Sequence, residues 1–335
     1  MDLDRLAGAI AAKGETKVMT AALAHDKLRA LQRNCERVIK GKSDVIRRVT
    51  IGILANGHIL IEDVPGVGKT TLARLLARSI DCAFQHIQFT SDLLPSDILG
   101  VSIYDKDKKV FEFKRGPIFA NIVLADEINR TSPKTQSALL EAMNTAQVSI
   151  DGTTHSLPRP FMVIATQNPI EFHGTFPLPR AQLDRFLLRV RMGYPAREDE
   201  LTILREQIEI GAIDHIKPVL TGGDILAMQG EVRKVTVDDD LISYIQAIAQ
   251  ATRQSPSIEL GVSTRAALSL RACAQACAYF LGRDYCTPDD VKEVAVSVLA
   301  HRIQVARAFE SESLADRHED EEVLERIIAN VPVPL

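Results

Sequence analysis

The chain has 335 residues, of which 46% are hydrophobic and 25% charged, and a formal net charge of −4 at pH 7. This composition is ordinary for a globular protein in water, and the length predicts two domains rather than one core. The acidic balance argues against a protein whose main task is to grip nucleic acid. Residues 27–48 are basic, but apolar residues recur there at helical spacing, which favours a solvated helix face over a nucleic-acid patch.

The five cysteines include no C-x-x-C pair, which is typical of buried thiols in a reducing cytosol. Cys273 and Cys277 lie one helical turn apart, yet no histidine or further cysteine at ligand spacing joins them. Residues 1–17 have an acidic opening and no apolar core of signal length. No run reaches the roughly 18 apolar residues that a membrane span needs. We therefore expect a cytoplasmic protein without a transmembrane helix.

Short apolar runs alternate with amphipathic segments from residue 58 to 192. This pattern predicts a parallel sheet covered by helices on both faces. The expected strands are residues 58–62, 84–89, 121–125, 161–166 and 186–192. Two further segments, 103–113 and 148–157, predict β-hairpins, the second because it contains Asp-Gly.

Residues 200–310 have long helical periodicities and many alanines, which indicates a second, helical domain. Within it, T-P-D-D-V at 287–291 is a helix start, with threonine at the cap and proline in the first turn. The charge run at 316–322 predicts a solvated helix or a loose end. The expected domains are an N-terminal segment, helical or loose (1–28), an α/β core with its hairpins (29–195), a helical domain (196–312) and a charged tail (313–335).

The stretch E-D-V-P-G-V-G-K-T-T, which begins at residue 62, follows an expected strand and opens an expected helix. That is the context which a phosphate-binding loop requires, the alternative being a glycine-rich structural turn. Gly66 and Gly68 let the backbone turn its N–H groups inward, and the helix N-terminus favours an anion. Lys69 would meet the β- and γ-phosphates of a nucleotide, and Thr70 would ligate Mg²⁺.

One position departs from the usual phosphate loop, G-x-x-x-x-G-K-[ST]. Asp63 stands where that pattern has its first glycine. This place lies at the strand end, before the inward-turned N–H groups begin. A carboxylate there repels phosphate if it points inward and is harmless if it points away.

A second signal is I-V-L-A-D-E at 122–127, an apolar strand that ends in two carboxylates. Such a pair suits Mg²⁺-assisted hydrolysis, in which Asp126 holds the ion through water and Glu127 orients or deprotonates the attacking water. A surface acidic pair is the alternative. Asn168, at the carboxyl end of the fourth strand, would lie between the first and third strands if the strand order is shuffled, and its amide would bind both the γ-phosphate and the water.

Two arginines are candidates for charge stabilisation, although a lone arginine is usually a surface ion pair. Arg185, in A-Q-L-D-R-F, precedes the fifth strand, and Arg265, in G-V-S-T-R-A-A, opens a helix of the second domain.

Together these segments resemble the AAA+ ATPases and, within them, the MoxR family. The resemblance covers about residues 30–310 and rests on G-H-I-L-I-E-D-V-P-G-V-G-K-T, F-T-S-D-L-L-P-S-D-I-L-G, G-P-I-F-A-N-I-V-L-A-D-E-I-N-R, T-Q-S-A-L-L-E-A-M, I-A-T-Q-N-P-I-E, P-L-P-R-A-Q-L-D-R-F, T-R-Q-S-P-S-I-E-L-G-V-S-T-R, G-R-D-Y-C-T-P-D-D-V and V-L-A-H-R. It implies an α/β AAA+ P-loop core with a parallel five-stranded sheet, followed by a small all-α lid domain. Relatives in this family also begin the loop with Glu-Asp.

The resemblance implies a role for each matching residue. Lys69 and Thr70 correspond to the Walker A pair, Asp126 and Glu127 to the Walker B pair, and Asn168 to sensor 1. The residues implied to bind ATP are Pro65, Gly66, Val67, Gly68, Lys69, Thr70, Thr71, Asp126 and Arg265, with Thr70 and Asp126 also holding Mg²⁺.

The resemblance also implies a homo-oligomeric ring, usually a hexamer, with ATP held between neighbouring subunits. Arg185 resembles the finger that reaches into the neighbour's site, and Arg265 resembles sensor 2, which reports nucleotide to the lid. Segments 91–115 and 147–158 resemble the helix-2 insert and the pre-sensor hairpin, which face the pore or the client, and V-I-K-G-K at 38–42 would lie near the adenine.

Two departures fall where subunits should meet. The family usually has P-L-P-E-A-Q, but here the fourth residue is Arg180. The helix after the Walker B pair usually ends in a charged pair, but here the segment reads N-T-A-Q at 144–147. Both bear on interface electrostatics and self-assembly, not on the phosphate chemistry.

The function favoured by the sequence is an ATP hydrolase that remodels or matures a protein client, working with a separate protein that carries a von Willebrand factor A domain. This chain lacks the D-x-S-x-S metal motif of that domain. One alternative is a nucleotide-gated scaffold with negligible turnover. Another is the motor subunit of a DNA-remodelling or chelatase-like complex, of which the DNA version is disfavoured by the acidic balance.

Overall fold

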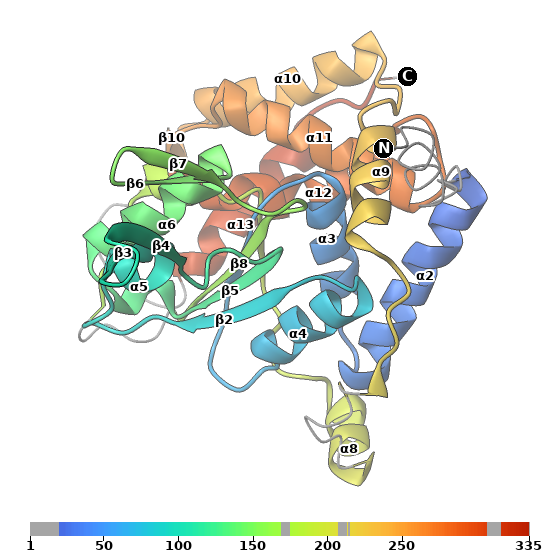
Figure 1. Ribbon diagram of the computed structural model, residues 1–335. Coiled ribbons are helices and arrows are strands. Elements are labelled where there is room, and N and C mark those ends of the chain that lie inside the picture. Colours follow the sequence, from blue (N-terminus) through green and yellow to red (C-terminus); the bar gives the residue numbers. More distant parts are fainter. Residues whose placement is uncertain (1–19, 169–174, 207–212, 214, 307–315, 335) are drawn as a thin grey trace, which may run out of the picture.

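The computed structural model describes residues 20–168, 175–206, 213, 215–306 and 316–334. It has an α/β domain followed by a helical domain (Figure 1). All five predicted strands are present and parallel, in the order β2-β5-β8-β1-β9. Their bounds are β1 (Ile59–Glu62), β2 (Phe84–Gln88), β5 (Ile122–Asp126), β8 (Met162–Gln167) and β9 (Leu188–Val190).

The sheet separates two hydrophobic cores. Ile59 and Ile61 of β1 belong to one core, whereas Leu60 between them belongs to the other. Successive side chains of a strand point to opposite faces, so a strand that is covered on both sides is apolar throughout. One core includes residues of α2 (Ala21–Val38), α3 (Ser43–Leu54), α4 (Lys69–Ser79) and the helical domain, and the other includes residues of α5 (Pro95–Leu99) and α6 (Pro133–Thr145).

Both predicted hairpins are present and interrupt the α/β pattern. The first pairs β3 (Gly100–Asp105) with β4 (Val110–Arg115), and the second pairs β6 (Gln147–Ile150) with β7 (Thr153–Ser156). The rings of Phe113 and His155 stack with centroids 4.2 Å apart, so the two hairpins touch. Figure 1 shows them together at one side of the sheet.

The helical domain consists mainly of α9 (Gly222–Val232), α10 (Asp239–Gln254), α11 (Thr264–Phe280) and α12 (Pro288–Leu299), with a short pair of strands, β10 (Ile258–Leu260) and β11 (Gln304–Val305). The predicted helix start at Thr287 is confirmed, because Thr287 and Asp290 form a capping box and Pro288 occupies the first turn. Smaller helices are η1 (Ile128–Arg130), α7 (Arg180–Leu183), α8 (Arg197–Glu206) and η3 (Ala300–Arg302).

Both ends of the described chain are helical, one of the alternatives expected for each, and residues 1–19 of the expected N-terminal segment lie outside the described residues. Helix α2 runs unbroken through residue 28, and Ala24 and Leu28 are buried on it. The charge run near residue 320 is helical, in α13 (Asp316–Asn330), but Leu324 and Ile328 are buried and the helix packs on α10 and α12. The charge run is therefore helical, one of the two expected alternatives, and apolar residues that recur at helical spacing just after it bury one face of the helix. In the part of the chain that the structure describes, no helix is both long and apolar enough to cross a membrane.

Candidate nucleotide site

The loop between β1 and α4 has the backbone of an anion cradle. Gly66 and Gly68 have φ angles of +83° and +92°, a region that side chains other than glycine rarely adopt. A Cβ added at Gly66 would meet no described atom within 4 Å, so the space above the loop is open. Helix α4 begins directly after Gly68, and the free N–H groups of a helix start favour an anion. This geometry fits the phosphates of a nucleotide.

Lys69 lies across the base of the loop. Its side chain is buried, and Nζ donates hydrogen bonds to the carbonyl oxygens of Asp63 at 2.8 Å and Val64 at 3.1 Å. The loop also borders a cleft of about 280 Å³, which it shares with the end of α2 and with α8. The cleft is lined by Val38, Ile39, Lys40, Lys42, Gly66, Val67, Gly68, Thr71, Pro195 and Ile203. The segment expected near adenine and the phosphate loop therefore share one cleft.

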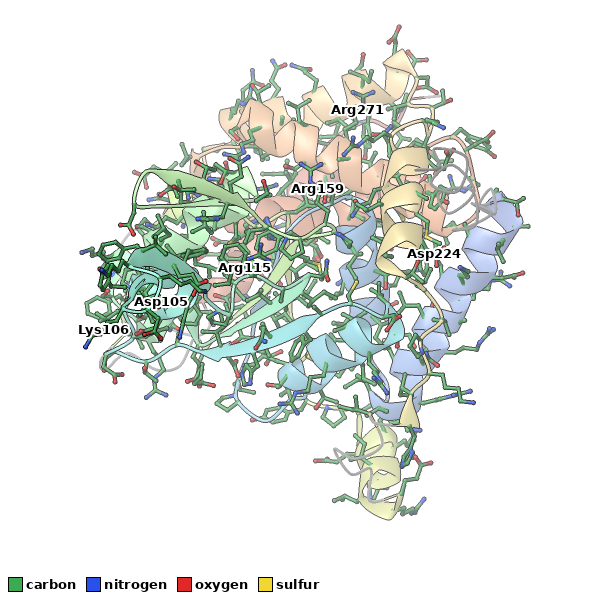
Figure 2. All side chains as sticks on the ribbon, viewed as in Figure 1. Asp105, Lys106, Arg115, Arg159, Asp224 and Arg271 are labelled. Carbon is green, nitrogen blue, oxygen red and sulfur yellow. The ribbon has the colours of Figure 1, made fainter. Side chains whose placement is uncertain are left out.

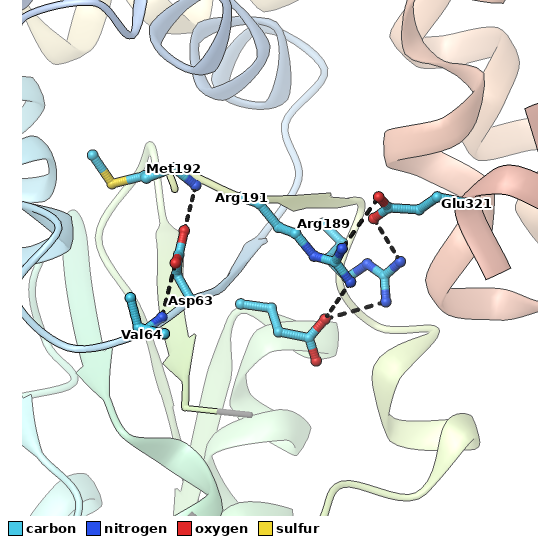
Figure 3. Close-up of polar contacts among 7 residues, drawn as sticks. Asp63, Val64, Arg189, Arg191, Met192 and Glu321 are labelled. Atoms are coloured by element: carbon cyan, nitrogen blue, oxygen red, sulfur yellow. Dashed lines mark hydrogen bonds and ion pairs between the residues drawn. The ribbon is translucent and has the colours of Figure 1, made fainter. Parts of the chain in front are cut away.

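The Asp63 carboxylate is held by backbone N–H groups, among them those of Met192 and Val64 (Figure 3). Its Oδ2 accepts hydrogen bonds of 2.6 Å from the backbone N–H groups of Met192 and Gly193, and Oδ1 accepts one of 2.8 Å from Val64 N–H. Met192 and Gly193 follow β9, at the passage to the helical domain. The aspartate is therefore occupied by backbone donors and does not oppose an anion in the loop.

The residue before Asp63 ties the same strand end to the C-terminal helix. Glu62 Oε2 lies 3.3 Å from Arg189 Nη1 and 3.5 Å from Arg191 Nη2, and both arginines also contact Glu321 of α13, at 2.9 and 3.3 Å (Figure 3). The four side chains are between 9% and 26% exposed. This network of ion pairs therefore links the end of β1 to both β9 and α13.

The carboxylate pair at the end of β5 meets the start of α4. Asp126 Oδ2 lies 3.5 Å from Thr70 Oγ1 and 3.2 Å from His86 Nε2, and Asp126 Oδ1 accepts a hydrogen bond from Thr166 Oγ1. A hydroxyl and a carboxylate beside a phosphate cradle are oxygen donors of the kind that Mg²⁺ takes. The two residues expected to hold the metal are thus brought together by tertiary structure.

Glu127 follows β5 in a left-handed conformation, with φ of 57°. Its Oε2 accepts hydrogen bonds from Gln88 Nε2 at 2.8 Å and from Arg130 Nη1 at 2.9 Å, and its N–H donates to Thr166 Oγ1. These contacts hold the carboxylate at the carboxyl edge of the sheet.

Asn168 lies at the same edge of the sheet. It directly follows β8, which pairs with both β5 and β1, so the expected position between the first and third strands is confirmed. The residue is buried, and its carbonyl accepts a hydrogen bond from Asn129 Nδ2 at 3.2 Å. Phosphate loop, carboxylate pair and amide therefore share one end of the sheet, where α/β folds bind ligands.

Arg185 and Arg265 lie elsewhere. Both line a pocket of about 510 Å³ between the α/β and helical domains, and its lining includes no residue of the phosphate loop. Arg159, Arg233 and Arg302 line it too, and Figure 2 labels Arg159 near the middle of the molecule. The pocket is therefore strongly basic.

Contacts within the chain orient the side chains at the two positions that depart from the family pattern, Asn144 and Arg180. The amide of Asn144, placed with its oxygen toward Arg185, accepts hydrogen bonds of 3.2 Å from Nε and Nη1 of that arginine. Arg180 donates a hydrogen bond to the carbonyl of Ile303, so it faces its own helical domain. Arg180 is thus engaged within the chain.

Sequence reasoning missed several polar residues of the site. Thr166, His86 and Gln88 all contact the carboxylate pair, but each belongs to a strand neighbouring β5. The signal was weak: His86 and Gln88 alternate with apolar neighbours at the end of an expected strand.

Comparisons with known proteins match the arrangement. The model of the ATPase family associated with various cellular activities (AAA) matches residues 58–188, and that of the AAA lid domain matches residues 250–327. The chain is 48% identical to the uncharacterized protein YeaC of Bacillus subtilis, over 93% of this chain and 96% of that protein. It is 40% identical to the chaperone MoxR1 of Mycobacterium tuberculosis, over 89% of this chain and 80% of that protein.

The chain belongs to the MoxR family of AAA+ ATPases. A solved structure of an ATPase from Cytophaga hutchinsonii has the same fold, with a TM-score of 0.84 and 40% identity, over 94% of this chain and 97% of that one. In this MoxR protein the five-stranded sheet is the AAA+ core and the helical domain is the lid. The lid match extends to residue 327 and so includes most of α13.

Proposed function

We propose that this MoxR protein binds ATP with Mg²⁺ between neighbouring copies in a homo-oligomeric, hexameric ring and hydrolyses it to remodel or mature a protein client. One observation supports the proposal: the phosphate loop lies beside the carboxylate pair, while Arg185 and Arg265 line a separate pocket. Two half-sites on one chain make a complete site only when copies meet.

The first half-site has the groups that phosphoryl transfer needs. The N–H groups of residues 66–71 and the Lys69 ammonium would bind the phosphates. Thr70 and Asp126 would hold Mg²⁺, which when bound supplies positive charge to the phosphate oxygens. Glu127 would orient or deprotonate the attacking water, and Asn168 would bind that water and the terminal phosphate.

The second half-site supplies positive charge to a neighbour. The pocket that Arg185 and Arg265 line includes no residue of the phosphate loop. Arg265 is 62% exposed and its Nε lies 3.8 Å from Asp184, so it is available at the surface. We place both arginines against the nucleotide of the adjacent subunit, where such a finger is worth roughly 10³ to 10⁵ in turnover.

The β3–β4 hairpin supports contact with a protein client. Tyr104 and Phe111 are 48% and 73% exposed, and their rings lie 5.3 Å apart between centroids. Val101, Ile103 and Val110 on the same hairpin are also exposed. Clustered exposed apolar side chains mark protein-binding surfaces. The relative in M. tuberculosis is named a chaperone, and we propose a separate von Willebrand factor A domain protein as a partner.

The test is steady-state ATP hydrolysis with Mg²⁺ as a function of protein concentration. Specific activity should rise with concentration, and both Glu127→Gln and Arg185→Ala should abolish it, while Glu127→Gln still binds ATP. Arg271→Ala is the matched control, because Arg271 lies on α11 with Arg265 but does not line the arginine pocket. Activity that is absent or independent of concentration, and unaffected by Arg185→Ala, would favour the nucleotide-gated scaffold instead.

A further inference from the structure

The backbone on both sides of Arg185 is held by two consecutive residues of the lid. Arg302 Nη2 donates hydrogen bonds to the carbonyl oxygens of Asp184 at 3.3 Å and of Phe186 at 2.8 Å. His301 Nε2 lies 3.0 Å from the same Phe186 oxygen. Arg185, the residue between the two acceptors, has its side chain in the arginine pocket.

A charge pair strengthens this contact. Arg302 Nε lies 3.0 Å from Asp184 Oδ1, and the arginine side chain is only 4% exposed. Arg302 Nη1 donates a further hydrogen bond of 3.0 Å to the carbonyl of Val298 within the lid. Separating the lid from segment 184–186 would leave a buried guanidinium without its partners, which is strongly unfavourable. Lid and segment should therefore move as one body.

The segment that Arg302 holds leads directly to the phosphate loop. From Phe186 the chain enters β9 and reaches Met192 and Gly193, whose N–H groups bind Asp63 at the start of the loop. One stretch of eight residues thus connects the lid contact with the chain's own nucleotide site. The contact with Arg302 lies at one end of this stretch, and the contact with Asp63 lies at the other.

We propose that Arg302 is a positioning residue for Arg185. It fastens Arg185 to the lid of its own subunit, so that the position of this lid determines where Arg185 lies in the nucleotide site of the neighbouring subunit. This inference rests on the shared-site function proposed above. It differs from a purely structural role because the loss should appear in the neighbour's site and not in the chain's own ATP binding.

The test is complementation between two impaired variants. Arg302→Lys keeps a positive charge but loses the fork that reaches Asp184 and Phe186 together. We expect unchanged ATP affinity and a turnover about 10-fold to 100-fold lower, the range that follows from misplacing a catalytic group. Mixing it with Lys69→Ala, which has a disabled site but an intact finger, should restore hydrolysis. Arg283→Lys is the matched control, because Arg283 pairs with Asp290 inside the lid, and it should hydrolyse ATP like the wild type.

Two further arms separate the possible failures. Arg185→Ala mixed with Lys69→Ala must also regain activity; if it does not, the shared site itself is refuted. If that pair complements but Arg302→Lys with Lys69→Ala does not, the positioning role is refuted. Should Arg302→Lys not fold, Asp184→Asn carries the same test, because it removes the charge that Arg302 faces while keeping the side-chain shape.

Discussion

The carboxylate of Asp63 holds the backbone N–H groups of Met192 and Gly193 at 2.6 Å each. The first residue of the phosphate loop is thereby fastened to the chain where β9 gives way to the lid. Asp63 is only 8% exposed, so the contact is shielded from water. An aspartate in place of the usual glycine therefore fastens the phosphate loop to the end of β9, just before the chain leaves the α/β domain.

Replacing Asp63 by alanine should weaken both stability and ATP binding. Each N–H group left unpaired away from water costs about 1–3 kcal/mol, so we expect a loss of roughly 2–4 kcal/mol in the free energy of unfolding. Urea denaturation and fluorescence titration with an ATP analogue measure the two effects. Asp107→Ala, at the exposed tip of the β3–β4 hairpin, is the control. Wild-type values for Asp63→Ala would show that the contact is dispensable.

Gln88 should restrain Glu127 before hydrolysis. It donates a hydrogen bond of 2.8 Å to Glu127 Oε2, and this bond must break for the carboxylate to meet the attacking water. Removing a net hydrogen bond of about 0.5–1 kcal/mol should raise basal ATP hydrolysis of Gln88→Ala roughly two- to fivefold. Gln85→Ala, on the opposite face of β2, should leave the rate unchanged. A fall in rate, as for Glu127→Gln, would mean that Gln88 orients the carboxylate for reaction.

Glu321 should contribute to the stability of the whole chain although it lies in the charged C-terminal segment. Its carboxylate is shared by Arg189 and Arg191, which also hold Glu62. Glu321→Ala leaves two largely buried arginines with one carboxylate, and we expect a loss of about 1–2 kcal/mol, between the values for exposed and buried pairs. The urea midpoint measures it, and Glu325→Ala, exposed on the same helix, is the comparison. Equal midpoints for both variants would contradict the network's role.

His301 should make stability depend on pH. Burial, with the nearby charges of Arg302 and Arg189, lowers the pKa of His301 well below its usual 6.5. Its Nδ1 has no hydrogen-bond partner among the described residues, so a proton there would be buried and unpaired. Below pH 6.5 the unfolded chain binds a proton that the folded chain does not, so this contribution to stability is full above 6.5 and declines as the pH falls.

The variant His301→Gln isolates this effect, because glutamine can still donate to the Phe186 carbonyl but does not titrate. Relative to this variant, the wild type should lose about 1.4 kcal/mol per pH unit below 6.5, or about 2 kcal/mol by pH 5. His58, whose pKa burial lowers to about 4, is common to both proteins and cancels in the difference. Parallel stability curves for the two proteins would show that His301 takes up its proton in the folded state.

Much of the fold and of the first half-site could be predicted because its signals are local. The loop with Lys69 and Thr70 and the pair Asp126–Glu127 each occupy a few consecutive residues, and the strands β1, β5 and β8 are largely apolar runs that two cores cover. The position of Asn168 also followed, once a shuffled strand order was assumed. Hydrophobic periodicity and turn residues act between neighbours in the sequence, so these signals can be read without knowing the fold.

Contacts between segments that are distant in the sequence could not be predicted and became visible only in the folded structure. No pattern near residue 63 shows that its carboxylate binds the amides at 192 and 193, and none near residue 302 shows that its guanidinium holds the backbone around Arg185. The buried face of α13 was likewise concealed by the charges that precede it. Local sequence patterns were enough to predict the strands, the phosphate loop and the carboxylates. The partners of the buried charged side chains depend on how the lid packs against the core. A buried charge is unfavourable unless it is paired, and the groups that pair with it come from segments that are distant in the sequence.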